Sequence, residues 1–193
     1  MSRPLTIAVF TCAAVLGALA PVYAQDAPAQ PVAGVETTDI ETHGDWTVRC
    51  FKVQASPAPC DMSQIVLDDN SKKRLMQISL GYAPGADAYA TQIIVPLGVS
   101  LSQGLTLSVG DYRAANIRFR RCMPDGCYVE AQIETDAIKA MTSNQAATVT
   151  VIGWGDAHVF DLPLSLKGFV EAHDAMVKLN RAKAAAAPVP SNP

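Results

Sequence analysis

The sequence predicts an all-β fold: an antiparallel β-sandwich of about nine strands with a short helix and a C-terminal helix. Apolar and polar residues alternate through most of residues 46–164, which is the pattern of strands that bury one face. These runs are five to nine residues long, and clusters of Gly, Pro, Asp and Asn separate them, as in sandwiches and barrels. Two further segments have helical spacing instead.

The clearest predicted strand is RLMQISLGY, at residues 74–82. Met76, Ile78 and Leu80 share one face, and polar or small residues occupy the other. By the same pattern, strands are expected near residues 45–51, 60–68, 73–82, 89–95, 104–110, 115–122, 127–134, 146–153 and 157–163.

Two helices are expected. TDAIKAMTSN, at residues 135–144, can form about two turns with Thr135 or Asp136 as the N-cap. The second runs over residues 165–186, with Ser165 as a candidate cap. Its apolar stripe is expected to pack on the sandwich, and binding of a partner to the stripe is the alternative. The stripe consists of Phe169, His173, Met176, Val177 and Asn180.

The N-terminal residues 1–24 are expected to be a secretory signal peptide. Arg3 precedes an apolar run at residues 5–19, and small residues lie before the expected cleavage after Ala24. A membrane anchor is the alternative, but the run is short for a span of about 20 residues. We expect a periplasmic protein without a transmembrane anchor after cleavage, with outer-membrane association or secretion as alternatives.

Composition divides the rest of the chain into three parts. Residues 25–41 are rich in Ala, Pro, Gln and Thr and predict a flexible leader. Residues 42–180 predict the β-sandwich domain, and residues 181–193 predict a disordered tail. Loss of Arg3 with the signal changes the formal charge from −3 to −4, which argues against nucleic acid as a partner.

Four cysteines remain once Cys12 is removed with the signal: Cys50, Cys60, Cys122 and Cys127. An even number in an exported protein indicates disulfides, and the local pairs 50–60 and 122–127 are favoured. Zinc is the weaker alternative, because only the second pair approaches the spacing of a zinc knuckle. No metal and no cofactor are expected.

FRRCMPDGCYVEAQ, at residues 119–132, predicts a β-hairpin with a Pro-Asp-Gly turn, closed by its two cysteines. Burying the apolar residues on one face requires a register slip, and this predicts a bulge near Gly126. The expected cross-strand partners are Phe119 with Ala131, Ile117 with Ile133, and Arg120 with Glu130.

No catalytic residue is predicted. The G-x-S-x-G motif of hydrolases is absent, and the three histidines form no metal-binding pair. A pocket around His158 and Asp156 is the arrangement that would favour an enzyme. His173 is expected to be packed rather than catalytic.

Arg118, Arg120, Arg121 and Trp154 are the candidate partner-binding residues. The arginines would contact an anion or an acidic partner, and a solvated strand face is the alternative. Trp154 lies between two glycines, which allows its ring to be exposed. Exposed strand edges also permit a homodimer.

Five segments of the chain resemble the invasion-associated locus B (IalB) family of exported alphaproteobacterial proteins. They are GDWTVRC (44–50), PCDMSQ (59–64), IIVPLGVSLSQGLTLSVG (93–110), IRFRRCMPDGCYVEAQI (117–133) and FDLPLSLKGFVEAHDAM (160–176). Together they cover roughly residues 43–177.

The resemblance implies a periplasmic or envelope-associated β-sandwich, and it supplies no catalytic residues. It favours a non-enzymatic protein that binds a protein or a cell-surface component. The family name refers to host-cell invasion in one pathogenic genus, and that role is not expected to transfer. A periplasmic enzyme of unrecognised type and a chaperone-like accessory are the alternatives.

Overall fold

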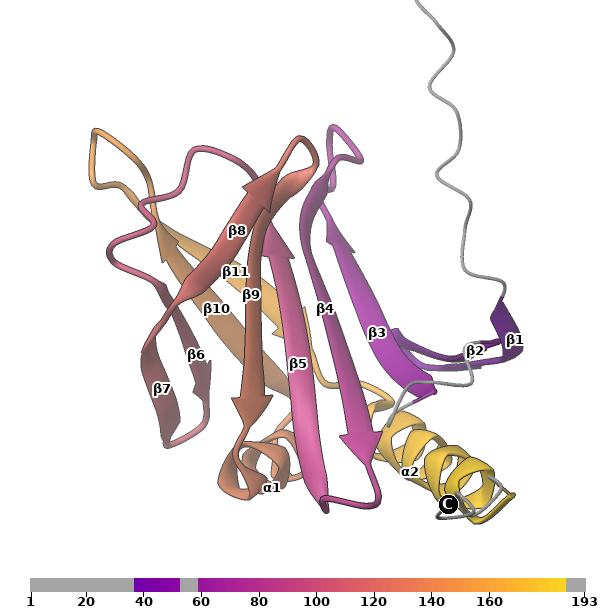
Figure 1. Cartoon of the computed structure of the whole chain (residues 1–193). Helices are drawn as coiled ribbons and strands as arrows, with labels where there is room; N and C mark the ends of the chain where they lie inside the picture. The colour runs from indigo at the N-terminus through magenta and orange to yellow at the C-terminus, as the bar shows by residue number, and fades with distance from the viewer. Residues whose placement is uncertain (1–36, 53–58, 187–193) are drawn as a thin grey trace, which may run out of the picture. The chain divides into compact units, whose positions relative to one another are not determined.

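The computed structural model describes residues 37–52 and 59–186, drawn in colour in Figure 1. In these two ranges the chain forms eleven strands and two helices. The strands are β1 (Thr37–His43), β2 (Trp46–Phe51), β3 (Cys60–Leu67), β4 (Arg74–Ala83), β5 (Ala88–Val95), β6 (Leu105–Val109), β7 (Tyr112–Ile117), β8 (Phe119–Met123), β9 (Gly126–Ile133), β10 (Ala146–Ile152) and β11 (Val159–Ser165). The helices are α1 (Thr135–Ser143) and α2 (Phe169–Ala186).

The strands form two antiparallel sheets. The larger has the order β1-β2-β3-β4-β5-β9-β8, and the smaller has the order β11-β10-β6-β7. Figure 1 shows the smaller sheet behind the larger one, with both helices at one end and several strand-connecting loops at the other. The predicted all-β, antiparallel, sandwich-like fold with a C-terminal helix is confirmed.

The core lies between the two sheets. Ile78 and Val129 of the larger sheet belong to the same buried cluster as Leu107 and Val149 of the smaller one. All four side chains come from the apolar face of an alternating strand, so the period of two in the sequence is the direct cause of this arrangement.

Helix α2 closes the sandwich at one end. Phe169 is fully buried, and its ring packs edge-on against Trp46 with 5.2 Å between the ring centroids. The Trp46 indole Nε1 donates to the carbonyl oxygen of Ser165 at 3.0 Å, so the buried ring leaves no polar group unpaired. The predicted stripe on this helix therefore packs on the sandwich, with Phe169, Met176 and Asn180 at its centre.

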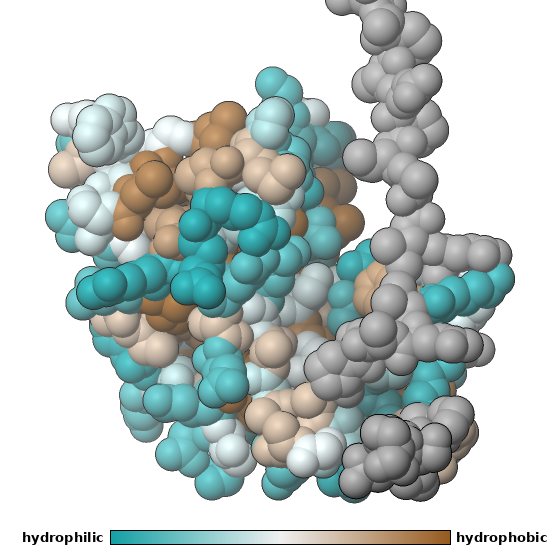
Figure 2. All heavy atoms as spheres, in the orientation of Figure 1, coloured by the Kyte–Doolittle hydropathy of each residue, from teal (hydrophilic) through white to brown (hydrophobic). Residues whose placement is uncertain are grey.

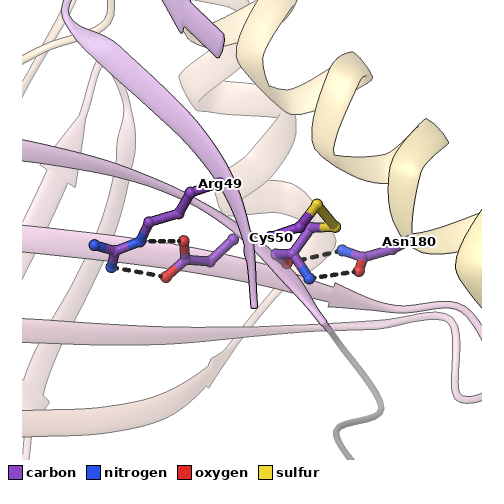
Figure 3. The surroundings of a disulfide bond; sticks show 5 residues. Arg49, Cys50 and Asn180 are labelled. Carbon is purple, nitrogen blue, oxygen red and sulfur yellow. Dashed lines mark hydrogen bonds and ion pairs between the residues drawn. A yellow bond between two sulfur atoms is a disulfide. The ribbon is translucent and has the colours of Figure 1, made fainter. Parts of the chain in front are cut away.

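Asn180 is a fully buried polar residue on α2. Its amide Nδ2 donates to the Cys60 carbonyl oxygen, and its Oδ1 accepts from the Cys60 backbone N–H, both at 2.9 Å. Figure 3 shows Asn180 reaching from the helix to the disulfide-linked strands, with Arg49 on the other side of these strands. The Asn180 side chain thus provides the donor and the acceptor that a neighbouring strand would otherwise provide to the Cys60 backbone.

The structure corrects two predicted boundaries. Strand β1 lies partly within residues 25–41, the predicted flexible leader, and pairs with β2. Helix α2 continues to Ala186, where the predicted helix of residues 165–186 also ends, so the predicted disordered tail over residues 181–193 begins too early. The predicted signal peptide (residues 1–24), residues 25–36 and residues 187–193 lie outside the described residues.

The predicted strand at residues 115–122 is two strands in different sheets. Strand β7 ends at Ile117 in the smaller sheet, and β8 begins at Phe119 in the larger one. Asn116 has a φ of +56°, which marks the break just before the crossover. Because Ile117 and Phe119 both fit the same alternation, the sequence does not reveal the break.

The predicted helix caps are also wrong. The N-cap of α1 is Glu134, and Thr135 is already inside the helix. Ser165 is the last residue of β11 rather than the cap of α2. Its hydroxyl donates to Asp45 at 2.6 Å and accepts from the Lys167 N–H at 3.2 Å, so it stabilises the connection to the helix.

The hairpin between β8 and β9 contains a bulge, but not at the predicted position. Cys122 lies opposite Cys127, and Phe119 lies opposite Val129 rather than Ala131. The register shifts between Phe119 and Arg121, which makes Arg120 the extra residue. The expected Arg120–Glu130 pair is therefore wrong.

Ile117 also differs from its prediction, since it pairs with Leu105 of the smaller sheet and not with Ile133. Gly126 is required for a different reason than a bulge. A Cβ atom at this position would lie 2.5 Å from the carbonyl oxygen of Val95, so only glycine allows the turn to approach β5 this closely.

Candidate binding surface

The four cysteines form two disulfides between neighbouring strands. Cys50 on β2 is bonded to Cys60 on β3, and Cys122 on β8 is bonded to Cys127 on β9. Each bond joins two residues that lie directly opposite in the sheet register. The cysteines thus hold strand pairs together, and the described residues contain no group of three or more His, Cys, Asp or Glu side chains that could hold a metal ion.

The three candidate arginines do not form one face. Arg121 lies on β8 and makes an ion pair with Glu130, and its guanidinium carbon is 4.8 Å from the centroid of the Tyr128 ring. Arg118 at the crossover and Arg120 at the bulge are exposed, and neither has an ion-pair partner among the described residues. Of the three candidate arginines, Arg118 and Arg120 are therefore the ones available to contact a partner.

Trp154 lies in the turn between β10 and β11, and 76% of its surface is exposed. Gly155 beside it has a φ of +93°, a conformation that favours glycine. The backbone N–H of Trp154 donates to the carbonyl oxygen of Gly98 at 2.8 Å, so the turn is tied to the loop after β5. The exposed indole is thus presented from an ordered backbone.

Trp154 is part of a larger exposed apolar surface, which we call the apolar rim. Ten large apolar side chains are exposed in the described part of the chain, and six of them lie in or beside the β5–β6 loop, the β8–β9 turn and the β10–β11 turn. The rim consists of Leu97, Leu101, Met123, Trp154, Val159 and Phe160, which are between 44% and 76% exposed. Such a concentration differs from the scattered exposed apolar residues of an ordinary surface.

Hydrogen bonds fix the connections that carry the rim. Ser100 donates its backbone N–H to Ile152 at 2.7 Å, which joins the loop after β5 to the β10–β11 turn. At the other side, Arg74 donates to the carbonyl oxygen of Asp125 at 2.6 Å. Pro96, Leu97 and the Pro124–Asp125 turn line one hollow of about 520 Å³ with Arg74. The β5–β6 loop therefore contacts both the β10–β11 turn and the β8–β9 turn, and the rim surrounds these three connections.

Figure 2 shows apolar residues gathered toward the upper edge of the molecule, with a hydrophilic band across the face below them. Arg118 and Arg120 belong to the segment that leads to Met123 of the rim. A strand rises about 3.3 Å per residue, which places Arg120 about 10 Å along the chain from Met123. Free positive charge thus adjoins the apolar rim.

A second concave surface lies on the outer face of the larger sheet. It is an open hollow of about 540 Å³ whose floor contains the small residues Gly81 and Ala90. On one side Arg49 donates to both carboxylate oxygens of Asp61 at 2.9 and 3.2 Å, and on the other Gln92 donates to Glu130 at 3.1 Å. These polar groups already satisfy one another.

The histidines are far apart in the fold. His43 is on β1 beside Glu41, and His158 is in the exposed β10–β11 turn, where its backbone N–H donates to Asp156 at 3.0 Å. Neither His158 nor Asp156 lines the two hollows described above. Both side chains are exposed in this turn.

His173 is the half-buried histidine of α2, packed as predicted. Its Nε2 lies 2.9 Å from the Tyr89 hydroxyl, and its Nδ1 lies 3.1 Å from Asp174. Burial raises the pKa of Tyr89, which keeps its hydroxyl protonated. A nucleophile would need the opposite shift, so this group of three is better explained as the connection between α2 and β5.

Residues 46–177 match the family model described as Invasion associated locus B (IalB) protein. The chain belongs to the IalB family. The match extends from the start of β2 into α2, so it includes both disulfides, the free arginines and the apolar rim.

Two curated relatives are each called an invasion protein B homolog, from Brucella abortus (strain 2308) and Brucella abortus biovar 1 (strain 9-941). Each is 27% identical over 148 residues, which is 77% of this chain and 84% of the relative. The crystal structure of invasion associated protein B from Bartonella henselae is similar, with a TM-score of 0.66 and 20% identity over 75% of this chain and 99% of that one. At this identity the likeness to the Bartonella protein shows a shared fold.

The sequence pattern identifies Trp154 as a candidate binding residue, but it does not identify the other residues of the apolar rim. Leu97 and Leu101 stand in PLGVSLSQG, where proline and glycine interrupt the strand pattern. Apolar residues in such a segment cannot all point into a sheet core, and that is the available signal. Met123 carries no comparable signal, because it continues the alternation of β8.

Proposed function

We propose that this IalB-family protein is an exported, non-enzymatic binding protein of the cell envelope. It recognises a protein or a cell-surface component through the apolar rim together with Arg118 and Arg120. The observation that carries this proposal is the concentration of six exposed large apolar side chains in or beside three connections, two of which are joined by backbone hydrogen bonds. Exposed apolar surface of this kind marks interaction sites.

Export is supported by the two disulfides, because such bonds persist in oxidising compartments such as the periplasm. In the described part of the chain, no helix combines the length and the apolar character needed to cross a bilayer. The signal-peptide prediction for residues 1–24 agrees with export. The expected location is the periplasm, with outer-membrane association or secretion as alternatives.

The non-enzymatic assignment rests on the pairing of polar groups. Arg49 pairs with Asp61 in the hollow of the larger sheet, and Glu130 at the edge of that hollow pairs with Arg121. A catalytic acid or base needs to be available to a substrate, and these side chains are instead held in pairs with one another.

Affinity capture from an envelope extract tests the proposal. The bait is the chain from Gln25, as the predicted cleavage would leave it. We expect the double variants Trp154→Ser/Leu97→Ser and Arg118→Glu/Arg120→Glu to lose the captured partner. Arg121 is left unchanged because its removal would leave Glu130 without its ion-pair partner.

The matched control is Ile65→Ser/Val170→Ser, which removes two exposed apolar side chains from β3 and α2. Capture that survives both rim variants, or that the control abolishes equally, contradicts the proposal. A chaperone-like accessory is the second candidate, since an apolar rim also suits unfolded chains. In that case the wild-type protein would suppress aggregation of unrelated unfolded proteins, and the rim variants would not.

A further inference from the structure

We propose that the partner of the apolar rim is the surface of an anionic lipid bilayer, into which the rim side chains insert while Arg118 and Arg120 contact lipid phosphates. This inference rests on the proposed function, because it assigns a partner to the same surface. It commits to one class of partner, and a protein partner becomes an outcome of the test.

The first argument is the composition of the rim. Trp154 is its most exposed member, and tryptophan is enriched where membranes meet water because its ring is apolar and its N–H is polar. The other five side chains are aliphatic or Phe, and none of the six is charged. They lie in or beside three separate connections at one end of the sandwich, where Figure 1 shows the loops extending beyond the sheets.

The second argument is that the rim backbone is already paired. Trp154 donates to Gly98, Ser100 donates to Ile152, and Gly153 donates to His158, all at 2.7–2.8 Å. Unpaired backbone groups are costly to bring into lipid, and these bonds reduce that cost. The loops therefore need little rearrangement to enter the interface.

The third argument is the position of charge. Arg118 and Arg120 are exposed without a partner among the described residues, and Arg120 lies about 10 Å along the strand from Met123. Apolar groups of surface-bound proteins penetrate about 5–10 Å past the headgroups, so an arginine at this distance reaches the phosphate layer. Its long side chain can adjust to that depth.

Acidic groups near the rim do not reverse this charge. Asp125 accepts hydrogen bonds from Tyr128 at 2.6 Å and from Arg74 at 3.3 Å. Glu130 is paired with Arg121. Asp156 is the acidic residue within the β10–β11 turn itself, and its Oδ1 accepts the His158 N–H. Asp161, next to Phe160, is a second carboxylate without an ion-pair partner among the described residues, and it accepts from the Thr150 hydroxyl at 2.6 Å. Arg118 and Arg120 are thus matched by two carboxylates, each of which already accepts one hydrogen bond.

Vesicle binding tests the inference, with the chain from Gln25 as the protein. The probes are vesicles of phosphatidylglycerol and phosphatidylcholine in equal amounts, and vesicles of phosphatidylcholine alone. We expect cosedimentation with the anionic vesicles, weaker binding to the neutral ones, and further weakening by added salt.

Tryptophan emission gives a second readout that needs no variant. The chain has two tryptophans, and Trp46 is fully buried while Trp154 is exposed. A blue shift of the emission on adding anionic vesicles therefore reports the transfer of Trp154 from water. Wild-type protein that sediments with vesicles without this shift would overturn the insertion of the rim.

Matched variants measure separately how much the apolar rim and the two arginines contribute to vesicle binding. Trp154→Ser/Leu97→Ser is expected to weaken binding at least about tenfold, because two large apolar side chains no longer transfer from water into lipid. Arg118→Glu/Arg120→Glu is expected to weaken it about fivefold or more for each arginine, and to remove the preference for anionic lipid. The controls are Ile65→Ser/Val170→Ser and Arg113→Glu/Lys178→Glu, which alter exposed residues elsewhere and should bind as wild type.

The outcomes distinguish this inference from the proposed function. Failure to bind vesicles, combined with rim-dependent capture of a protein from envelope extract, overturns the membrane inference and leaves the binding function in place. Rim-dependent doubling of the mass in solution without vesicles identifies a second copy as the partner and also overturns it. If neither vesicles nor extract reveal any rim-dependent binding, both proposals fail.

Discussion

The two ends of the sandwich treat large apolar side chains in opposite ways. At the helix end, Phe169 and Trp46 are fully covered by α2, and even the polar Asn180 finds both of its partners. At the loop end, Trp154 and five other large apolar side chains remain exposed. A helix therefore covers one end of the sandwich, and the other end is left uncovered. Substitutions at the helix end should change the free energy of unfolding more than substitutions at the loop end.

The largest expected difference is between Phe169 and Trp154. Phe169→Ala should lower the free energy of unfolding by about 4 kcal/mol, because it leaves a cavity beside Trp46. Trp154→Ser should change it by no more than about 0.5 kcal/mol, because an exposed side chain packs against little of the protein. Urea unfolding followed by circular dichroism measures both. A large loss for Trp154→Ser would show that the rim stabilises the fold.

Asn180 offers the next largest effect. Asn180→Leu keeps a similar volume but leaves the backbone N–H and carbonyl of Cys60 buried without partners. We expect a loss of about 3 kcal/mol in the free energy of unfolding. Lys178→Leu on the exposed side of α2 is the control and should be nearly neutral. Equal effects of the two substitutions would mean that these hydrogen bonds contribute little.

The two disulfides allow a further comparison, because Cys50–Cys60 lies at the helix end and Cys122–Cys127 lies at the loop end. Removing Cys50–Cys60 with alanines should cost about 3 kcal/mol, and removing Cys122–Cys127 about 2 kcal/mol, since the loops they close are short. The first change should leave vesicle binding intact, and the second should weaken it by loosening the turn beside Met123. The reverse assignment of the binding defect would contradict the placement of the rim.

The smallest expected effect is the pH dependence of stability that Asp125, beside the rim, contributes. The hydroxyl of Tyr128, followed by Arg74, holds the pKa of Asp125 below its ordinary value of 3.8. The carboxylate therefore contributes stability above about pH 4, and this contribution is lost as the pH falls through the lowered pKa. NMR titration of the carboxyl carbon measures it, and Tyr128→Phe should move the pKa of Asp125 upward. An unchanged value in this variant would exclude the hydroxyl as the cause.

Much of the fold was predictable because β strands with one buried face impose an alternation that survives in the sequence. Met76, Ile78 and Leu80 illustrate this, since all three are buried as predicted. The crossover at Arg118 was not predictable, because Ile117 and Phe119 keep one alternation while they enter different sheets. Strand β1 was missed for a related reason, since TTDIETH at the sheet edge has little apolar alternation to detect.

The candidate surface was predictable only in part. Arg118, Arg120 and Trp154 can be selected from the sequence because these residue types are unusual in their positions. Leu97 and Leu101 can be recognised as part of the surface only from the folded structure, in which the loops contact one another. Arg121 could not be separated from its neighbours, because the bulge at Arg120 decides which way each arginine points. Bulges depend on pairing between strands, and a single alternating segment does not contain that information.

The bond between Asn180 and Cys60 has a consequence for the order of assembly. The two residues are separated by 120 positions, so the helix end cannot close until almost all of the described chain is present in the compartment where it folds. The Cys50–Cys60 disulfide needs only ten residues of separation and can form long before. Until α2 arrives, Trp46 and the β2–β3 strands remain exposed, and this interval is when the nascent protein is most in need of protection from aggregation.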